Sequence, residues 1–399
     1  MAPFPIDASA TCDVIVVGAG LTGLAAAVGF ARAGRRVISA GAAERLGHGR
    51  TVALLGPSVD FLDQLGVWPA LEPHAAPMRG LRIVDDTGSL FAPPPVEFRA
   101  REIGRDVFGW NVENAALADA LESAAAAQPN LVRIAANAAA FDFARERATV
   151  TLADGRVFAA ALVVGADGRA SPSRRAAGIA VWTRRHPHSA LTVLIAHARP
   201  HGDVSTEFHT RQGPFTLVPL PAAPGAPHRS SLVWAMSEAE AKRRAALDDA
   251  GLAAEIERQA RSLLGAMRIE GERGIFPLAR QSVRRFAATR LALVGDAAHA
   301  FPPIGAQGLN LGLRDVKALI AATLASADVG ADDALRRYAA RRAADVAFRT
   351  AAVAALNRSL IADCAPVDLA RGLGLAALGA IPPLRRLTMR EGVAPLFPG

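Results

Sequence analysis

The 399-residue sequence predicts an α/β protein with α+β elements, in which a parallel sheet is interrupted by an inserted, mostly antiparallel sheet and followed by a helical C-terminal region. Three observations predict this class. The chain opens with an apolar run, a glycine-rich turn and a helical pattern, in that order. Between about residues 181 and 286, apolar and polar residues alternate as they do in antiparallel strands. After Lys317 the pattern is helical to about Leu360.

The opening strand is predicted at Val14–Val17 and is followed by Gly18, Gly20 and Gly23 at G-x-G-x-x-G spacing. Gly18 permits a tight turn, Gly20 lets the backbone approach a pyrophosphate, and Gly23 lets the helix pack on the strand. The N-terminus of that helix offers amide donors and positive potential to phosphates. With a second strand from Val37, this order is typical of a Rossmann-type dinucleotide-binding domain.

One expected residue of such a domain is replaced. Dinucleotide-binding folds usually carry a carboxylate at the end of the second strand, where it holds ribose hydroxyls. In this sequence the position falls on Gly41. Glu44, three residues later, either reaches back to replace that carboxylate or is a solvated loop residue, and the sequence leaves both readings open.

Two helices are expected in the following segment. Arg50 and Thr51 precede a short helix that we expect to be capped by Ser58 and to end at Gly66. A further helix is expected to begin at Asn114, because asparagine is a favourable N-cap residue.

A hairpin is predicted next, with Asp154 and Gly155 at its turn, and it leads into a buried strand. Asp167 and Gly168, in the sequence "GADG", lie just past the C-terminal end of that strand. Ligands of open α/β sheets bind at this edge, so both residues are candidates for a ligand site.

The segment Gly295–Val316, "GDAAHAFPPIGAQGLNLGLRDV", follows another apolar strand pattern. Its prolines remove backbone donors and its glycines remove side chains, so it suits close approach of the main chain to a flat or charged ligand. Ordinary connections between a strand and a helix are much shorter, which argues against a simple linker.

Composition limits the classes of partner. The net charge is +8, but of 45 basic residues only Lys242 and Lys317 are lysines, and the arginines are spread along the whole chain. With a single tyrosine and no basic stripe containing aromatic residues, nucleic-acid binding is not expected. Cys12 and Cys364 are too few for a disulfide framework, which favours the cytoplasm, and no secretion signal or spanning segment is expected.

Five histidines occur between His186 and His209. Their spacing is irregular and no cysteine or acidic pair accompanies them, so a polar surface segment is favoured over a metal site. No metal is expected elsewhere.

The ordered motifs resemble the flavoprotein hydroxylases of the p-hydroxybenzoate hydroxylase fold over most of the chain. "GAGLTG" is similar to the FAD fingerprint of that family, "GADG" to its second motif, and "GDAAHAFPPIGAQGLNLGLRD" to its third, in a form closest to the ubiquinone-biosynthesis hydroxylases. "GWNVENAAL" and the C-terminal "GLGLAALGAIPPLRRLTMREG" also resemble that subfamily. The departures are Gly41 and "FPP", where many relatives have a His-Pro pair.

The resemblance implies roles for several residues of the third motif. Asp296 is expected to accept hydrogen bonds from ribityl hydroxyls, and Gly305 and Gly308 to let the main chain lie against the isoalloxazine ring. The helix that opens near Gln307 and Asn310 is expected to direct its amides at the pyrimidine edge of the flavin, where negative charge develops on reduction. The flavin-facing wall is expected to consist of Pro302 and Pro303.

Other polar residues have weaker assignments. Arg50 resembles the family arginine that approaches the FAD diphosphate, with a surface role as the alternative. Asp167 is expected to support the phosphates through water or through Arg50, with Ser171 and Arg174 as further candidates.

Hydrogen bonding or packing is favoured over base catalysis for His299. Arg314 and Asp315 are expected to support the first turns of their helix.

The resemblance also divides the chain. Residues 1–180 are expected to form the first part of the FAD-binding domain, with helical and hairpin insertions, and 181–286 the sheet of the substrate domain. Residues 287–360 are expected to complete the FAD-binding domain. Residues 361–399 are expected to form a C-terminal segment that is either membrane-facing, flanked by Arg385, Arg386 and Arg390, or a tail that packs on the domain.

By the resemblance, NAD(P)H reduces FAD, O2 forms a flavin hydroperoxide, and a polyprenylated phenol of ubiquinone biosynthesis is hydroxylated on its ring. The protein is expected in the cytoplasm, with peripheral association at the inner membrane surface or with a biosynthetic complex. Three alternatives stay open, namely a hydroxylase of a soluble aromatic compound, a flavin reductase, and a non-catalytic FAD-binding subunit. No catalytic acid or base can be named from the sequence.

Overall fold

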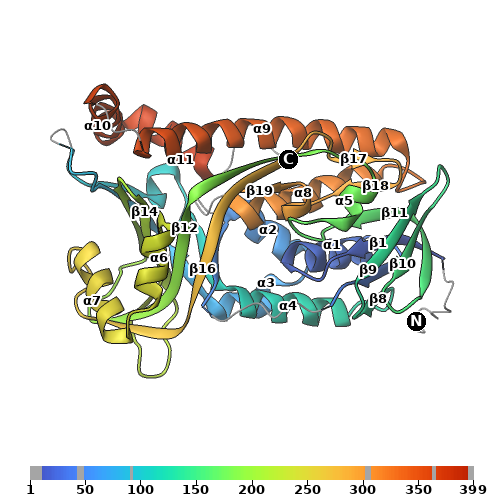
Figure 1. Ribbon diagram of the computed structural model, residues 1–399, viewed down its shortest axis with the longest axis horizontal. Helices are drawn as coiled ribbons and strands as arrows, with labels where there is room; N and C mark the ends of the chain where they lie inside the picture. Colours follow the sequence, from blue (N-terminus) through green and yellow to red (C-terminus); the bar gives the residue numbers. More distant parts are fainter. Residues whose placement is uncertain (1–10, 43–48, 90–92, 302–306, 362–364, 394–399) are drawn as a thin grey trace.

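The computed structural model describes residues 11–42, 49–89, 93–301, 307–361 and 365–393 of the chain. These residues form two lobes that share two long, curved strands, β12 (Val181–His197) and β16 (Met267–Val283) (Figure 1). One lobe holds a mostly parallel sheet covered by helices, and the other holds a mostly antiparallel sheet, which agrees with the expected fold class.

The parallel sheet has the order β17-β18-β11-β1-β2-β8, and β10 and β9 extend it as a hairpin on β11. From β18 to β8 neighbouring strands run parallel, so their carboxyl ends lie at one edge. The predicted hairpin at Asp154 and Gly155 is confirmed. The bounds are β1 (Thr11–Val17), β2 (Val37–Ala40), β8 (Leu131–Ile134), β9 (Ala138–Phe143), β10 (Ala148–Leu152), β11 (Val157–Gly165), β17 (Ala287–Ala288) and β18 (Leu291–Leu293).

Helices pack on this sheet through small and apolar side chains. α1 buries every residue from Gly23 to Ala31, because its alanines and glycines let it lie close to β1 and α8. The helix α4 starts at Asn114 as expected, but Asn114 is not its N-cap: Glu113 holds that position, without a side-chain capping bond. The expectation that Ser58 caps α2 is wrong: the helix starts earlier, at Gly56, because Pro57 supplies a preset helical φ in its first turn. The bounds are α1 (Leu21–Arg32), α2 (Gly56–Gln64), α3 (Trp68–Leu71), η1 (Glu72–His74), α4 (Asn114–Ala126), α5 (Pro172–Ala176), η3 (Gly295–Ala297), α8 (Gln307–Leu324) and α9 (Asp332–Ile361).

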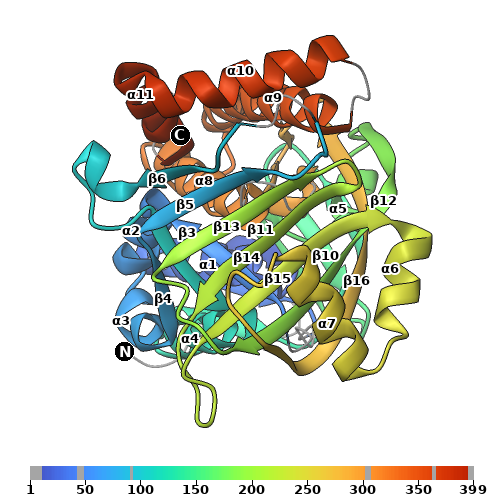
Figure 2. The same ribbon diagram turned by 90° about the vertical axis from the view of Figure 1, so that its left-hand side faces the viewer.

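The second lobe is built on an eight-stranded sheet with the order β19-β16-β12-β15-β14-β13-β5-β6, called here the substrate sheet (Figure 2). Adjacent strands are antiparallel except β13 and β5. Two of its strands, β5 and β6, precede residue 181 in the sequence. The sheet therefore includes residues from outside the expected range 181–286. The remaining bounds are β5 (Gly80–Asp85), β6 (Val96–Arg99), η2 (Ala100–Ile103), β13 (Val204–Thr210), β14 (Gly213–Leu220), β15 (Arg229–Ser237) and β19 (His299–Ala300).

A small sheet, β3-β7-β4, lies between the lobes. Its central strand is tied to the substrate sheet by Asn111, whose side-chain amide donates to the carbonyl of Pro219 at 2.9 Å and to Ser231 Oγ at 3.2 Å. Thr51 Oγ1 donates to the same Ser231 hydroxyl at 2.9 Å. These buried bonds fix the relative position of the two sheets. The bounds are β3 (Thr51–Leu55), β4 (Ala75–Met78) and β7 (Gly109–Glu113).

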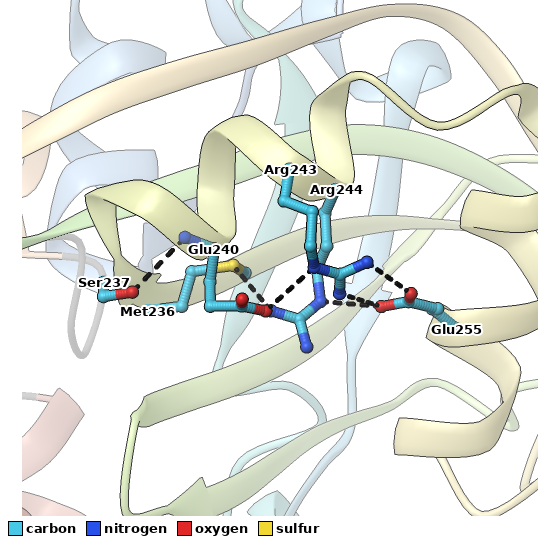
Figure 3. Close-up of polar contacts among 6 residues, drawn as sticks. All are labelled: Met236, Ser237, Glu240, Arg243, Arg244 and Glu255. Atoms are coloured by element: carbon cyan, nitrogen blue, oxygen red, sulfur yellow. Dashed lines mark hydrogen bonds and ion pairs between the residues drawn. The ribbon is translucent and has the colours of Figure 1, made fainter.

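Helices α6 (Glu238–Ala245) and α7 (Asp249–Gln259) cover the face of the substrate sheet that points away from the parallel sheet (Figure 1). Ser237 caps α6 by accepting from the backbone N–H of Glu240 (Figure 3). Figure 3 also shows how the two helices are joined, since Arg243 and Arg244 both donate to Glu255 of α7. The Arg244 guanidinium lies 4.3 Å from the centroid of the Trp234 ring, beneath α6.

Replacing Glu255 tests this joint. We expect Glu255→Ala to lower the free energy of unfolding by about 1 kcal/mol, because one carboxylate serves two guanidiniums at a partly shielded position. Hydrogen bonds from Arg243 lower the pKa of Glu255 against the opposing effect of burial, so this contribution should fade as the pH falls through the acidic range. Urea unfolding at neutral and acidic pH measures both effects. The control is Glu238→Ala, whose ion pair with Lys242 is exposed and should contribute nothing measurable.

The C-terminal helices α10 (Ala365–Ala380) and α11 (Pro382–Val393) pack against β6 and η2 at the edge of the substrate sheet. Met389 enters an apolar cluster with Val96 and Phe98. Arg385 is turned inward, where its Nε lies 2.6 Å from Glu102 and its guanidinium lies over the Phe98 ring. Among the described residues, no helix is long and apolar enough to cross a membrane.

Candidate functional site

The site is built where the parallel strands end. Gly18 follows β1, Gly41 follows β2, Asp167 follows β11 and Asp296 follows β18, and all four strands run in the same direction. Three of the expected motifs therefore meet at one edge of the sheet, although they are far apart in sequence. The N-termini of α1 and α8 lie at the same edge (Figure 1).

The first turn leaves no room for side chains at two of its glycines. Gly18 has φ +114°, and a Cβ there would lie 2.2 Å from the carbonyl oxygen of Ala166. A Cβ on Gly23 would lie 2.1 Å from the carbonyl oxygen of Gly18. A Cβ on Gly20 would meet no protein atom within 4 Å. The first two glycines are thus required by the protein itself, whereas the open space at Gly20 is available to a ligand.

The position of the missing carboxylate is closed by the turn beside it. A Cβ on Gly41 would lie 2.8 Å from the backbone nitrogen of Ala19 and 3.1 Å from its Cβ. An aspartate or glutamate at position 41 would therefore require the turn to move. Glu44, the possible substitute, lies outside the described residues.

Asp296 lies in the turn η3 after β18, and its side chain is 50% exposed, with the Arg169 guanidinium 3.4 Å away. Arg174 stabilises the turn by donating to the carbonyl of Ala297 at 2.7 Å and to the carbonyl of Arg169 at 2.7 Å. Arg174 is nearly buried, so the structure gives this candidate residue a supporting contact with the turn.

Asp167 is held by the helix that follows it. Its carboxylate accepts from Ser171 Oγ at 2.5 Å, from the backbone N–H of Ser173 at 2.8 Å and from Ser173 Oγ at 3.0 Å. Ser171 in turn caps α5 by accepting from the N–H of Arg174. These contacts stabilise the start of α5, and Gly168 keeps φ +75° between the two elements. The role of Asp167 towards phosphates stays a prediction.

Asp315 is the centre of a buried charge cluster, which the sequence does not predict. Its carboxylate accepts from the N–H of Gly295 at 2.9 Å, from His299 Nε2 at 2.6 Å and from Arg342 Nε at 2.6 Å. The side chains of Asp315, His299 and Arg342 are fully buried. Arg342 also donates to Asp345 at 2.6 Å. The expectation that Asp315 only supports the first turns of its helix is therefore wrong, because it joins α8, α9 and the turn that carries Asp296.

The same region is tied to the sheet by the single tyrosine. Tyr338 on α9 donates its hydroxyl to the carbonyl of Leu293 at 2.6 Å and is fully buried, and burial raises the pKa of its hydroxyl well above the usual range. Arg314 reaches Asp345 at 3.2 Å. No pattern in the sequence marks Arg342 or Asp345, since both are charged residues inside a long helix that is rich in arginine.

The start of α8 meets the expectation of an exposed backbone. Gly308 has open space around its Cα, with no protein atom within 4 Å of a Cβ built there, and Gln307 begins the helix. Asn310 is buried, and its side chain accepts from the N–H of Leu55 at 2.9 Å and donates to the carbonyl of Ala53 at 2.8 Å. The Asn310 side chain therefore fixes α8 to β3, and Gln307 and Asn310 stay predicted cofactor contacts.

Arg50 is exposed and lies immediately before β3. Its guanidinium is 4.6 Å from the centroid of the Phe276 ring on β16. The residue thus stands between the two lobes, which suits both its predicted role at a diphosphate and a cation–π contact. Pro302, Pro303 and Gly305 lie outside the described residues.

These residues fit FAD. The open space at Gly20 and Gly308, the unpaired first turn of α1 and the half-exposed carboxylate of Asp296 provide in one place the donors, acceptor and close backbone approach that a flavin dinucleotide needs. Each of these features faces the same edge, so they can act on one ligand.

Asp296→Asn tests the acceptor. Because the carboxylate is half exposed, we expect the unfolding free energy of the FAD-free protein to change little. A charged hydrogen bond contributes roughly 1.5–3 kcal/mol, so the dissociation constant of FAD should rise about tenfold to 100-fold. Flavin fluorescence titration gives that constant. Equal affinity for FAD in the variant and the wild type would remove Asp296 from the site.

The histidine-rich segment differs from its expected surface role. His197 is 6% exposed and His209 is 3% exposed, so two of the four histidines whose side chains the structure describes are buried. They lie on strands whose alternation places them inside, which composition alone does not reveal. No group of three or more potential metal ligands occurs among the described residues.

Comparisons with known proteins agree with this site. Residues 11–353 match the family model described as "FAD binding domain". The chain is 35% identical to "Ubiquinone hydroxylase UbiL" of Rhodospirillum rubrum, over 98% of this chain and 92% of that protein. It is 31% identical to "3-demethoxyubiquinol 3-hydroxylase" of Escherichia coli, over 95% and 97% of the two chains. The crystal structure of p-nitrophenol 4-monooxygenase from Pseudomonas putida superposes with a TM-score of 0.78 at 20% identity, covering 96% of this chain and 97% of that one.

The comparisons confirm the resemblance drawn from the three motifs, together with the fold and the cofactor. The match to the FAD-binding model covers both parts of the parallel sheet and the substrate sheet inserted between them. The protein therefore belongs to the FAD-binding domain family and is a flavin-dependent aromatic hydroxylase.

Proposed function

We propose that the protein hydroxylates the aromatic ring of a polyprenylated phenol in ubiquinone biosynthesis, using FAD, NAD(P)H and O2. The observation that carries this proposal is the similarity to ubiquinone hydroxylases over 95–98% of the chain, with the three cofactor motifs in place. When bound, FAD supplies the transfer of electrons from NAD(P)H to oxygen.

The residues of this chain bind and orient the cofactor. In this proposal the backbone amides around Gly20 and the guanidinium of Arg50 bind the diphosphate, and Asp167 supports the phosphates through water or through Arg50. Asp296 accepts hydrogen bonds from the ribityl hydroxyls. The N-terminal amides of α8, from Gln307 onward, stabilise negative charge on the pyrimidine edge.

A prenylated substrate is membrane-bound, so the proposal includes peripheral association at the cytoplasmic face of the inner membrane. Helices α10 and α11 and the residue between them expose four apolar side chains, which are 41–61% exposed: Leu373, Ile381, Leu384 and Leu387. Arg385 is not available to lipid because it pairs with Glu102. In vesicle flotation, Leu384→Ser/Leu387→Ser should shift the protein from the vesicle fraction to the soluble fraction, and unchanged flotation would contradict membrane contact by these helices.

The function is tested with purified protein, a visible spectrum and NAD(P)H oxidation under air, with and without a short-chain prenylphenol. Bound FAD, oxidation stimulated by the phenol and a hydroxylated product are expected. Turnover of small phenols that needs no prenyl chain would indicate a hydroxylase of a soluble aromatic compound. FAD that NAD(P)H cannot reduce in the presence of phenols would indicate a non-catalytic subunit, and reduction without oxygen use would indicate a flavin reductase.

A further inference from the structure

The substrate sheet has two faces with different partners. Phe208, Phe215, Trp234, Leu191 and Ile275 lie in register across five strands and pack with α6 and α7. Because side chains alternate along a strand, the next register row must point to the opposite face, towards the FAD-binding lobe. That face is called here the inner face.

The next row is His209, Pro214, Ala235, Ala190 and Phe276. At one end Phe276 lies beneath the guanidinium of Arg50, the predicted diphosphate residue. The three middle positions carry small side chains, and at neighbouring positions Val233 and Leu278 join Ala190 and Ala235 in an apolar cluster. With strands about 4.8 Å apart, the row spans roughly 19 Å. This row is therefore apolar between the Arg50 end and the His209 end.

An acid and a base are paired at the far end of this face. His209 and Glu207 are two residues apart on β13, so they share the inner face, and His209 Nε2 is 2.8 Å from Glu207 Oε1. Their side chains are 4% and 15% exposed. An ionised carboxylate can only accept, so it fixes the proton on Nε2 and leaves Nδ1 with a free lone pair. No partner for Nδ1 occurs in the part of the chain that the structure describes.

Two other charged residues near this pair have contacts in the turn after β5. Arg211, two residues after His209, donates from its Nε to the carbonyl of Thr87 at 2.8 Å. Asp85 on β5 is in register with His209 and is buried. Its carboxylate accepts from the N–H and the hydroxyl of Thr87 at 3.1 and 2.7 Å, which holds the turn after β5. Glu207 is therefore the carboxylate that orients His209.

We propose that His209, oriented by Glu207, is the base that removes the phenolic proton of the substrate; this inference rests on the proposed function. The phenol O–H bond breaks, an N–H bond forms at Nδ1, and the electron pair stays on the phenol oxygen. The resulting phenolate is electron-rich and accepts an oxygen atom on its ring more readily than the neutral phenol. The imidazolium is stabilised by Glu207 and returns its proton when the product leaves.

The proposal is tested with His209→Gln in the FAD-loaded full chain. We expect FAD content and reduction by NAD(P)H within about twofold of the wild type, and a loss of coupled hydroxylation of about 100-fold, as is typical for removal of a general base. A fluorinated analogue of the same prenylphenol, already ionised at the assay pH, should lose less than about tenfold. In a binding difference spectrum, the neutral phenol should show a phenolate band with the wild type and none with the variant.

Two further variants separate chemistry from folding. Glu207→Gln should lose less hydroxylation than His209→Gln, with the same rescue by the fluorinated phenol, because it removes the orienting charge but keeps the imidazole. The matched control is His197→Gln: His197 is also buried, but it bonds the carbonyl of Arg199 and Ser230 Oγ at the end of β12, outside the row described above. The control should keep both activities.

Each remaining outcome is decisive. Equal losses of His209→Gln with both phenols would assign His209 a structural role and overturn the inference, as would unchanged hydroxylation of the neutral phenol. A wild-type protein that hydroxylates no phenol would instead overturn the proposed function, so the two failures are distinguishable.

Discussion

Gly18→Ala is expected to yield a protein that binds no FAD and unfolds at a markedly lower urea concentration. The added Cβ would lie 2.2 Å from the carbonyl oxygen of Ala166, which is backbone and cannot rotate away. The φ of +114° is also unfavourable for a residue with a side chain. Strain and overpacking of this kind each cost about 1–3 kcal/mol, so the combined loss in unfolding free energy should be about 3 kcal/mol or more.

The loss of FAD binding follows from the movement of the turn that carries Gly18. To accept the Cβ, the turn between β1 and α1 must move away from the segment that carries Asp167. That movement separates two of the strand ends that meet at the site. The visible flavin spectrum after reconstitution measures FAD binding, and urea unfolding of the FAD-free protein measures the strain.

Gly20→Ala is the matched control in the same turn. Its φ is −73°, and its Cβ would meet no protein atom within 4 Å. The unfolding free energy should stay within about 1 kcal/mol of the wild type, the ordinary range for a change at an N-cap. FAD affinity should nevertheless fall, since the methyl group occupies space that the proposal gives to the diphosphate. Equal loss of stability in both variants would contradict this division of roles.

The turn at Gly18 could be predicted from the sequence because its determinants are local. Strand, glycines and helix occur within about 25 consecutive residues, and each position has one dominant physical reason to be there. The hairpin at Asp154 and Gly155 is predictable for the same reason. Local turn chemistry of this kind does not depend on the rest of the fold.

Long-range pairing was not predictable in the same way. The strands β5 and β6 join a sheet whose other strands begin about 100 residues later in the sequence. Nothing in the residues of β5 and β6 predicts that β5 will pair with β13. The buried state of His209 follows from this pairing, because β5 lies beside β13. Arg385 was expected to flank a membrane-facing segment, but Glu102 on η2 pairs with it. In each case the deciding contact comes from a distant element.

The cluster at Asp315 shows the same limit at the candidate site. A charged residue in an amphipathic helix is ordinarily solvated, and the sequence gives no sign that Arg342 will lie opposite Asp315. The contact requires α9 to cross α8 at one register. Only the tertiary structure shows that register. It also shows that the turn at Gly295 is stabilised by the Asp315 carboxylate.

Asp315→Asn is expected to be the most destabilising of the conservative substitutions discussed here. The change keeps the size of the side chain but leaves Arg342 with less negative charge in a fully buried position. Breaking a buried ion pair from one side typically costs about 3–5 kcal/mol, which we expect as the loss in unfolding free energy at neutral pH. FAD affinity should fall as well, because the N–H of Gly295 loses its charged acceptor.

The loss should depend on pH in a defined direction. Burial alone would raise the pKa of Asp315, but the charges of His299 and Arg342 and the hydrogen bonds to the carboxylate hold that pKa below its usual range. A lowered pKa in the folded state stabilises the protein above the unfolded-state value of about 3.9, and the contribution disappears as the pH falls through the folded-state value. The difference between wild type and Asp315→Asn should therefore shrink below about pH 4.

A double-mutant cycle with Arg342→Met identifies the pair as the cause. Since the two side chains are in direct contact, the double variant should lose less than the sum of the single losses, by more than about 1 kcal/mol. Asp333→Asn on the same helix is the control, because its ion pair with Arg337 is exposed and should not affect unfolding measurably. Additive losses in the cycle would show that Asp315 acts through Gly295 and His299 alone. In that case α9 would not stabilise the turn at Gly295 that carries Asp296.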